Sequence, residues 1–356
     1  MAHNLNINSQ PSLYIPASIN PIVEPNPEFY SIFSKEEIVN LINALEIERE
    51  IPLKYSYKGR GGKIWNDFYL KYIIPNWYRK SNVEIDLLKI NFDYLNGNHQ
   101  ECKQVNIIDV GAGNSYPIKY FINRLYKIGR ISKYVALDIS EELLQVSRKN
   151  FTKWFPKIDY ISDSLDIENS EIPKNLLSNH DTYGADETTN IFLHLGVTIG
   201  NHRNRVKALK NFRNSMGKND FLVFTNEIGA NSQWNGLVRG GCDYHAQKIY
   251  KWIQQKIGIK SEDCELIRKY DSQRDSVVAN IKFLRDYTIH FNHDNFQKNV
   301  EILKDEEVTI WRHHKYEMPE LLKELKEAGL EIFHHSTNKD NSHIMVICKI
   351  SKILNY

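Results

Sequence analysis

The sequence lacks the excess of basic residues that a nucleic-acid-binding protein usually carries. Lysine and arginine number 46 against 44 acidic residues, which leaves a formal net charge of +2 over 356 residues. Binding to a phosphate backbone requires a clear basic excess or a basic stripe. We therefore expect no nucleic-acid partner and look instead for a small-molecule substrate.

Cysteine and long apolar runs are also scarce. The four cysteines show no CxxC spacing, which argues against a zinc site and against a disulfide framework. No run of 18 apolar residues exists, and the polar first 27 residues lack the apolar segment of a signal peptide. We therefore expect a cytoplasmic protein without a membrane partner, as a monomer or a homodimer.

Two histidine pairs, His313-His314 and His334-His335, carry the most obvious metal-binding side chains. Adjacent residues on a strand point to opposite faces, so neither pair forms a natural chelate. Neither pair has the spacing or the neighbouring carboxylates of a zinc site. We predict no metal. His194 lies on an apolar run and reads as a buried core histidine.

The middle of the chain alternates between strand and helix patterns. Strands are expected at 105–110, 134–137, 157–161, 189–195 and 221–225, with helices at 117–127, 141–150 and 205–216. This alternation is typical of a doubly wound α/β domain. A helix at 317–328 precedes strand-like runs at 330–334 and 343–350, which we expect to close the sheet as a reversed hairpin.

The remaining segments suggest a second lobe. Residues 1–33 contain five prolines and read as a loosely structured arm. Ser34 caps a helix to about residue 50, and a glycine-rich loop follows at 54–62. We expect 34–80 and 227–315 to form a substrate-binding lobe. Residues 81–226 and 316–356 then form the cofactor-binding core.

A glycine turn at the end of the first expected strand predicts a cofactor site. Asp109, Gly111 and Gly113 follow a buried apolar run and precede a helix, where the backbone can approach a ligand closely. Dinucleotide enzymes add a third glycine, but Pro117 stands near that position. The turn therefore fits a methyl donor without phosphate, S-adenosylmethionine (SAM), better than NAD.

Acidic residues end the next two expected strands. Asp138 is placed to bind ribose hydroxyls, and Asp163 with Ser164 is placed to meet the adenine edge. A parallel sheet whose glycines only turn the chain would explain the glycines. It would not explain an acid at both strand ends.

Three segments resemble the histidine-specific SAM-dependent methyltransferase family, which includes a histidine N-alpha-methyltransferase and fungal dimethylallyltryptophan N-methyltransferases. Residues 195–201 (LGVTIGN) resemble the family's G-[ST]-[ST]-I-G-N pattern. Residues 54–61 (KYSYKGRG) resemble its K-x-[FL]-Y-D-x-x-G loop. Lys315-Tyr316, with the helix that ends at Gly329, resembles its closing segment. The resemblance implies an α/β fold with a Rossmann-like SAM methyltransferase core and a second α+β substrate-binding lobe.

The same resemblance implies roles for individual residues. Tyr57 would contact the methionine end of the donor, and Asn201 would bind the head group of the substrate. Both would align donor and acceptor for an in-line displacement, and an amine needs only a free lone pair to react. The implied cofactor-binding set is Tyr57, Gly61, Gly111, Gly113, Asp138, Asp163 and Ser164.

The substrate positions depart from the family pattern. Trp311 and His313 stand where the histidine enzymes place a Glu and a Ser, so histidine itself is a poor substrate. A larger or aromatic amine, stacked on Trp311 and Trp77 and contacted by Tyr78 or Tyr244, fits better. We expect N-methylation of an amino acid or an amino-acid-derived natural product. O- or C-methylation, and an inactive cofactor-binding homologue, are the alternatives.

Overall fold

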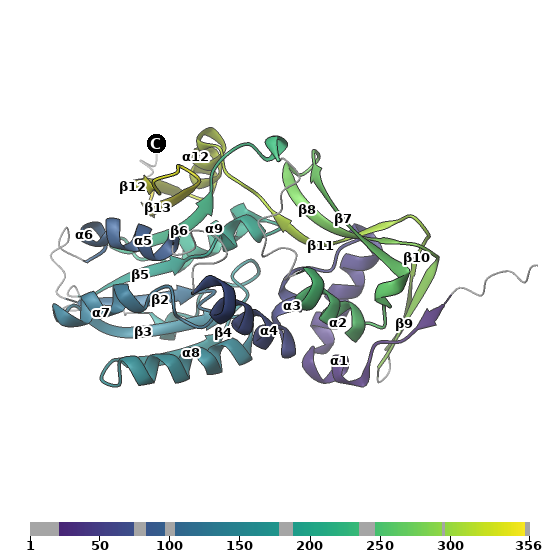
Figure 1. Cartoon of the computed structure of the whole chain (residues 1–356). Helices are drawn as coiled ribbons and strands as arrows, with labels where there is room; N and C mark the ends of the chain where they lie inside the picture. The colour runs from purple at the N-terminus through teal and green to yellow at the C-terminus, as the bar shows by residue number, and fades with distance from the viewer. Residues whose placement is uncertain are drawn as a thin grey trace, which may run out of the picture.

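The structure is a computed structural model that describes residues 21–74, 83–96, 104–177, 188–234, 246–293 and 296–352. It has two lobes (Figure 1). The first is built on a seven-stranded sheet with the strand order β12-β13-β6-β5-β2-β3-β4. Its strands are β2 (Gln104–Val110), β3 (Ile131–Asp138), β4 (Asp159–Ser164), β5 (Thr188–His194), β6 (Phe221–Glu227), β12 (Leu330–Thr337) and β13 (His343–Ile350).

The topology of this sheet is the one expected from the sequence. Strands β6, β5, β2, β3 and β4 run parallel, and β13 is antiparallel to both of its neighbours, β6 and β12. The expected Rossmann-like core with a reversed hairpin is therefore confirmed. Several strand ends differ from the prediction by a few residues. Strand β6 ends at Glu227 instead of residue 225, and Glu227 lines the cavity described below.

Helices cover both faces of the sheet (Figure 1). Consecutive strand residues point to opposite faces, so Ile107 belongs to one buried cluster and Ile108 to the other. The first cluster contains residues of α5 (Val83–Ile90), α6 (Phe92–Leu95), α7 (Lys119–Lys127) and α8 (Glu141–Trp154). The second contains residues of α9 (Arg205–Ser215) and α12 (Met318–Glu327).

The second lobe combines the N-terminal helices with two three-stranded sheets, β11-β8-β7 and β1-β9-β10. One buried cluster, which includes Phe29, Trp252 and Ile310, joins them. The helices are α1 (Pro27–Ile32), α2 (Lys35–Asn43), η1 (Ala44–Glu48), α3 (Lys54–Tyr57), η6 (Ala246–Tyr250) and α11 (Lys251–Lys256). The strands are β1 (Ile22–Val23), β7 (Cys264–Asp271), β8 (Ser276–Phe283), β9 (Tyr287–His293), β10 (Phe296–Ile302) and β11 (Glu307–His313).

Part of the expected loose arm belongs to this lobe. Asn26 caps α1 by accepting a hydrogen bond from the Glu28 amide, and Pro27 stands at the start of the helix, where its ring is tolerated. Phe29 and Phe33 are buried in the lobe's core. The prediction of a loosely structured segment is therefore wrong for residues 27–33, because these two aromatic side chains anchor it.

The prediction of a glycine-rich loop at 54–62 is also wrong. Residues 54–57 form α3, and α4 (Arg60–Phe68) begins three residues later and continues into η2 (Tyr69–Ile73). Gly62 lies so close to α8 that an added Cβ would stand 2.4 Å from Ser140 Oγ. An added Cβ on Gly61 would stand 1.9 Å from the Ser56 carbonyl oxygen. The glycines thus allow close packing of helices rather than a flexible loop.

Within the described ranges, no helix is long and apolar enough to cross a membrane.

Candidate active site

A cavity of about 1530 Å³ lies between the two lobes and is lined by residues of both. Four strands of the parallel sheet end at its wall, where open α/β sheets bind their ligands. The strand-end residues that line it are Asp109, Asp138, His194 and Glu227.

The glycine turn after β2 and the end of β3 hold each other in place. Gly111 and Gly113 have φ values of +78° and +54°, a region that favours glycine. The Gly113 amide donates a 2.9 Å hydrogen bond to Asp138 Oδ2, and the Ser140 amide donates one of 3.0 Å to Oδ1. The Trp65 ring lies against Gly113. A Cβ added to Gly113 would stand 2.8 Å from the nearest ring carbon of Trp65.

The carboxyl groups on this wall have unusual proton affinities. Burial raises the pKa of Asp138 to about 6, although hydrogen bonds from the Gly113 and Ser140 amides act in the opposite direction. Burial likewise raises the pKa of Asp109 to about 7, against the hydrogen bond from the Tyr134 hydroxyl. Shifted carboxyl pKa values that cluster in a cleft are typical of functional sites.

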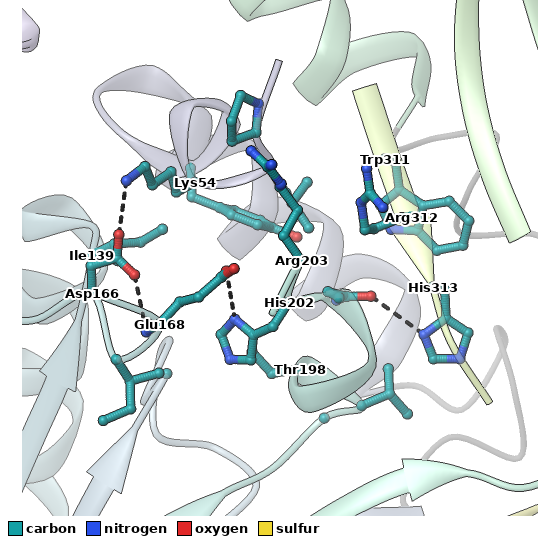
Figure 2. A pocket seen from close by; sticks show the side chains of 18 of the residues that line it. Lys54, Ile139, Asp166, Glu168, Thr198, His202, Arg203, Trp311, Arg312 and His313 are labelled. Atoms are coloured by element: carbon teal, nitrogen blue, oxygen red, sulfur yellow. Dashed lines mark hydrogen bonds and ion pairs between the residues drawn. The ribbon is translucent and has the colours of Figure 1, made fainter. Parts of the chain in front are cut away.

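His194, His202 and Glu168 form a series of polar contacts on the same wall. His194 Nδ1 lies 2.8 Å from the Val110 carbonyl oxygen, which only accepts, so this nitrogen donates. His194 Nε2 must then accept from His202 Nε2 at 3.0 Å. The other His202 nitrogen meets Glu168 at 3.3 Å (Figure 2). Burial alone would raise the pKa of Glu168, but the contact with His202 lowers it to about 2.

The acceptor side of the cavity gathers polar and aromatic groups from distant segments. Asn201 ends the short helix η4 (Thr198–Asn201), and its Oδ1 accepts a 3.3 Å hydrogen bond from His313 Nδ1 (Figure 2). The rings of Trp311 and His313 stack at 6.0 Å between centroids and 21° between planes. His313 Nε2 lies 3.7 Å from Glu227 Oε1 and has no hydrogen-bond partner among the described residues.

The sequence profile of the family described as "Histidine-specific methyltransferase, SAM-dependent" matches residues 35–234. The chain belongs to this family. It is therefore a SAM-dependent methyltransferase. The match includes the glycine turn, Asp138 and Asn201. It does not extend to Trp311 and His313, so the resemblance of the closing segment at Lys315 stays a prediction.

Solved structures similar to this methyltransferase include other methyltransferases. A SAM-dependent methyltransferase from Clostridium acetobutylicum is 13% identical, with 81% of this chain and 99% of that chain covered and a TM-score of 0.44. The methyltransferase CcbJ from Streptomyces caelestis is 10% identical, with 85% and 99% covered and a TM-score of 0.45. A comparison with curated protein sequences finds no match.

The donor wall fits SAM. Both glycines line the cavity, where Gly111 is exposed and Gly113 is covered by the flat indole of Trp65. Asp138 offers a buried carboxylate at the strand end, where ribose hydroxyls can donate to it. Tyr57 lines the same cavity, as the resemblance implied.

Three residues of the predicted cofactor set do not line the cavity. Gly61 is buried against the Ser56 carbonyl. Asp163 and Ser164 are exposed, and the Asp163 carboxylate accepts a hydrogen bond from the Ser164 amide. Strand β4 ends at Ser164, so the residues that turn into the cavity come later, at Leu165 and Asp166. Asp163 and Ser164 thus do not reach the cavity in this structure, and which residues meet the adenine stays a prediction.

Among the predicted substrate residues, the structure brings Asn201, Trp311 and His313 together. Trp77, Tyr78 and Tyr244 lie outside the described residues.

Sequence reasoning missed Trp65 and Glu227. Trp65 lies 48 positions before Gly113 in the sequence, and only the fold puts its ring on that glycine. Glu227 ends β6 as Asp138 ends β3, so the rule of acids at strand ends could have found it. The predicted strand ends at residue 225, so Glu227 was not recognised as an acid at a strand end.

Proposed function

We propose that this methyltransferase transfers a methyl group to the amine nitrogen of an amino acid or an amino-acid-derived small molecule other than histidine. The observation that carries the proposal is the grouping of Asn201, His313 and Glu227 beside the Trp311 ring. These groups come from both lobes and face the cavity whose opposite wall carries the donor residues.

The acceptor wall suits an amine because it offers acceptors for N–H groups. His313 Nδ1 donates to Asn201 Oδ1, and its Nε2 lies 3.7 Å from Glu227 Oε1. An ammonium group bound in the cavity beside this pair could give up one proton to it, which leaves a nucleophilic lone pair on the amine. When bound, SAM supplies a methyl group on a sulfonium. Asn201 and His313 keep the nitrogen oriented while the two lobes exclude water.

The lobe assignment belongs to the same proposal. We assign donor binding to the lobe of the seven-stranded sheet, and acceptor selection to the lobe that carries β11. Trp311 and His313 on β11 support this division, because both line the cavity and His313 contacts Asn201 of the first lobe directly.

The aromatic surface favours an aromatic acceptor over histidine. Trp311 is half-buried, lines the cavity and stacks on His313. An indole face binds another ring or a cation, whereas a polar imidazole needs hydrogen-bonding partners on both nitrogens. The family resemblance places a Glu and a Ser at these two positions in the histidine enzymes.

The test is a product screen. The purified protein is incubated with SAM and with aromatic and aliphatic amino acids, their amines and histidine, and products are located by tandem mass spectrometry. We expect a methyl group on nitrogen of an aromatic substrate and none on histidine. A methyl group only on oxygen or carbon would overturn the N-methyl assignment. A lack of product from every acceptor, together with intact SAM binding, would favour an inactive homologue.

A further inference from the structure

A second cavity, of about 320 Å³, lies behind the turn that carries Asn201, and four of its eight lining residues are arginines. Gly200 and Ser276 form part of its wall. Among the described residues around it, none of the lining side chains is a carboxylate. The other lining residues are His202, Arg203, Arg205, Arg274, Arg312 and His314.

The cavity lies where the two lobes meet. Gly200 belongs to η4 and Arg205 begins α9, both in the first lobe. Ser276 begins β8, and Arg312 lies on the neighbouring strand β11, in the second lobe. Figure 1 shows β8 and β11 at the side of the second lobe that faces α9. His202, Arg203 and Arg312 line this cavity and the first one, so a ligand here would contact both lobes beside the active site.

The arginines hold their carboxylate partners with part of each guanidinium group. Arg312 donates from Nε and Nη2 to Glu50, at 3.3 and 2.5 Å. Arg205 donates from the same two nitrogens to Glu324 and Glu320. In both residues Nη1 has no contact within the described part of the chain. A guanidinium has five N–H donors, so each retains donors for another oxygen ligand.

Ser276 provides an independent sign of a ligand. Its side chain is only 2% exposed, it lines the cavity, and its Oγ has no hydrogen-bond partner. Buried hydroxyl groups in native proteins almost always have a partner. Because Ser276 and four arginines line the same cavity, an oxygen ligand bound there could satisfy this hydroxyl and the arginine donors together.

We propose that this cavity is a second binding site, and that it binds a small oxyanion such as phosphate, sulfate or a carboxylate. The forked arginine donors match the oxygens of such an anion, and Ser276 adds a neutral donor. The back of the Asn201 turn forms one wall. An added Cβ on Gly200 would lie 2.4 Å from the His314 carbonyl oxygen, which shows how closely that wall is packed.

The experiment is a titration of the whole protein with phosphate. Binding is measured from the line width of the phosphorus NMR signal. We expect saturable binding by the wild type. Ser276→Ala removes an unpartnered hydroxyl, so it leaves the fold intact and weakens phosphate binding by about tenfold, as expected for one lost hydrogen bond. Arg274→Ala weakens it at least as much, because among the described residues the Arg274 side chain is held by a long ion pair of 3.7 Å with Asp271, which leaves its donors available to an anion.

Ser261→Ala is the matched control. Ser261 Oγ is also buried without a partner, but Ser261 does not line this cavity, so its replacement should leave phosphate binding unchanged. Saturating S-adenosylhomocysteine should also leave it unchanged. Absence of saturable binding, displacement of phosphate by S-adenosylhomocysteine, or equal effects of the two serine substitutions would each overturn the proposal. None of these results depends on the identity of the methyl acceptor.

Discussion

Asp138 serves two purposes at the donor wall. It accepts hydrogen bonds from the amides of Gly113 and Ser140, which fixes the glycine turn to the start of α8. We propose that the same buried carboxylate accepts hydrogen bonds from the ribose of SAM. Because burial raises its pKa to about 6, its charge changes close to neutral pH.

This shift predicts a pH-dependent donor affinity. Hydroxyl groups bind more strongly to an ionised carboxylate than to a neutral one, so SAM binding favours the deprotonated form. The affinity should therefore be full above pH 6 and fall as the pH drops through about 6. Calorimetric titrations with S-adenosylhomocysteine on either side of this pH measure the effect. Asp138→Asn should bind about 10- to 100-fold more weakly and lose this dependence. An unchanged pH profile in that variant would contradict the assignment.

His313 is the residue that separates acceptor chemistry from donor binding. We expect His313→Ala to lower kcat by about a hundredfold, because a positioned proton acceptor contributes on this scale. The dissociation constant for SAM should stay unchanged, since His313 lies on the opposite wall. His335→Ala, at an exposed position on β12, is the control. Equal losses of donor affinity and turnover in His313→Ala would point to a structural role.

At the scale of elements, the turn between β2 and α7 is the most constrained connection of the donor site. Gly113 and Gly129 share positive φ values of +54° and +67°. Their surroundings differ. A Cβ added to Gly113 would collide with Trp65, whereas a Cβ added to Gly129 would have no neighbour within 4 Å.

This pair predicts two different stability losses. Gly129→Ala should lower the free energy of unfolding by about 1–2 kcal/mol, the cost of a left-handed conformation for an L residue. Gly113→Ala should lower it further, because Trp65 must also move. Urea unfolding of both variants measures the difference. If both variants lose the same stability, the indole is not packed against the turn.

The glycine turn and Asp138 of the donor wall could be placed at the cavity from sequence, because they follow local rules, whereas Gly61, Asp163 and Ser164 could not. Glycines after a buried strand and an acid at the end of the next strand are visible within about 30 residues of sequence. The acceptor half is different, since Asn201 and His313 meet across 112 positions. No sequence pattern within a short window predicts such a long-range contact. The error at residues 54–62 has the same origin, because tertiary packing against Ser140 decides what those glycines do.

At the scale of the whole molecule, buried ion pairs hold the second lobe around the cavity. Glu50, beyond the end of η1, pairs with Arg312 on β11, and the two side chains are only 5% and 8% exposed. Backbone pairing of Glu50 with Thr309 accompanies this contact. The N-terminal segment and β11 are therefore fixed together before any ligand binds.

Removal of one partner should be costly. Arg312→Met leaves Glu50 buried with only Arg203 at 3.8 Å, so we expect a loss of about 3 kcal/mol in the free energy of unfolding. The double variant with Glu50→Gln should recover much of that loss, because no uncompensated charge stays buried. Urea unfolding followed by tryptophan fluorescence compares them. Equal losses in the single and the double variant would show that the pair's charge is not what stabilises this contact.

The most direct test of the donor site is a calorimetric titration of the protein with SAM. We predict saturable binding of one molecule per chain by the wild type and by Gly129→Ala, and greatly weakened binding by Gly113→Ala. Absence of binding heat from the wild type, or full affinity in Gly113→Ala, would contradict a donor site between the glycine turn and Trp65.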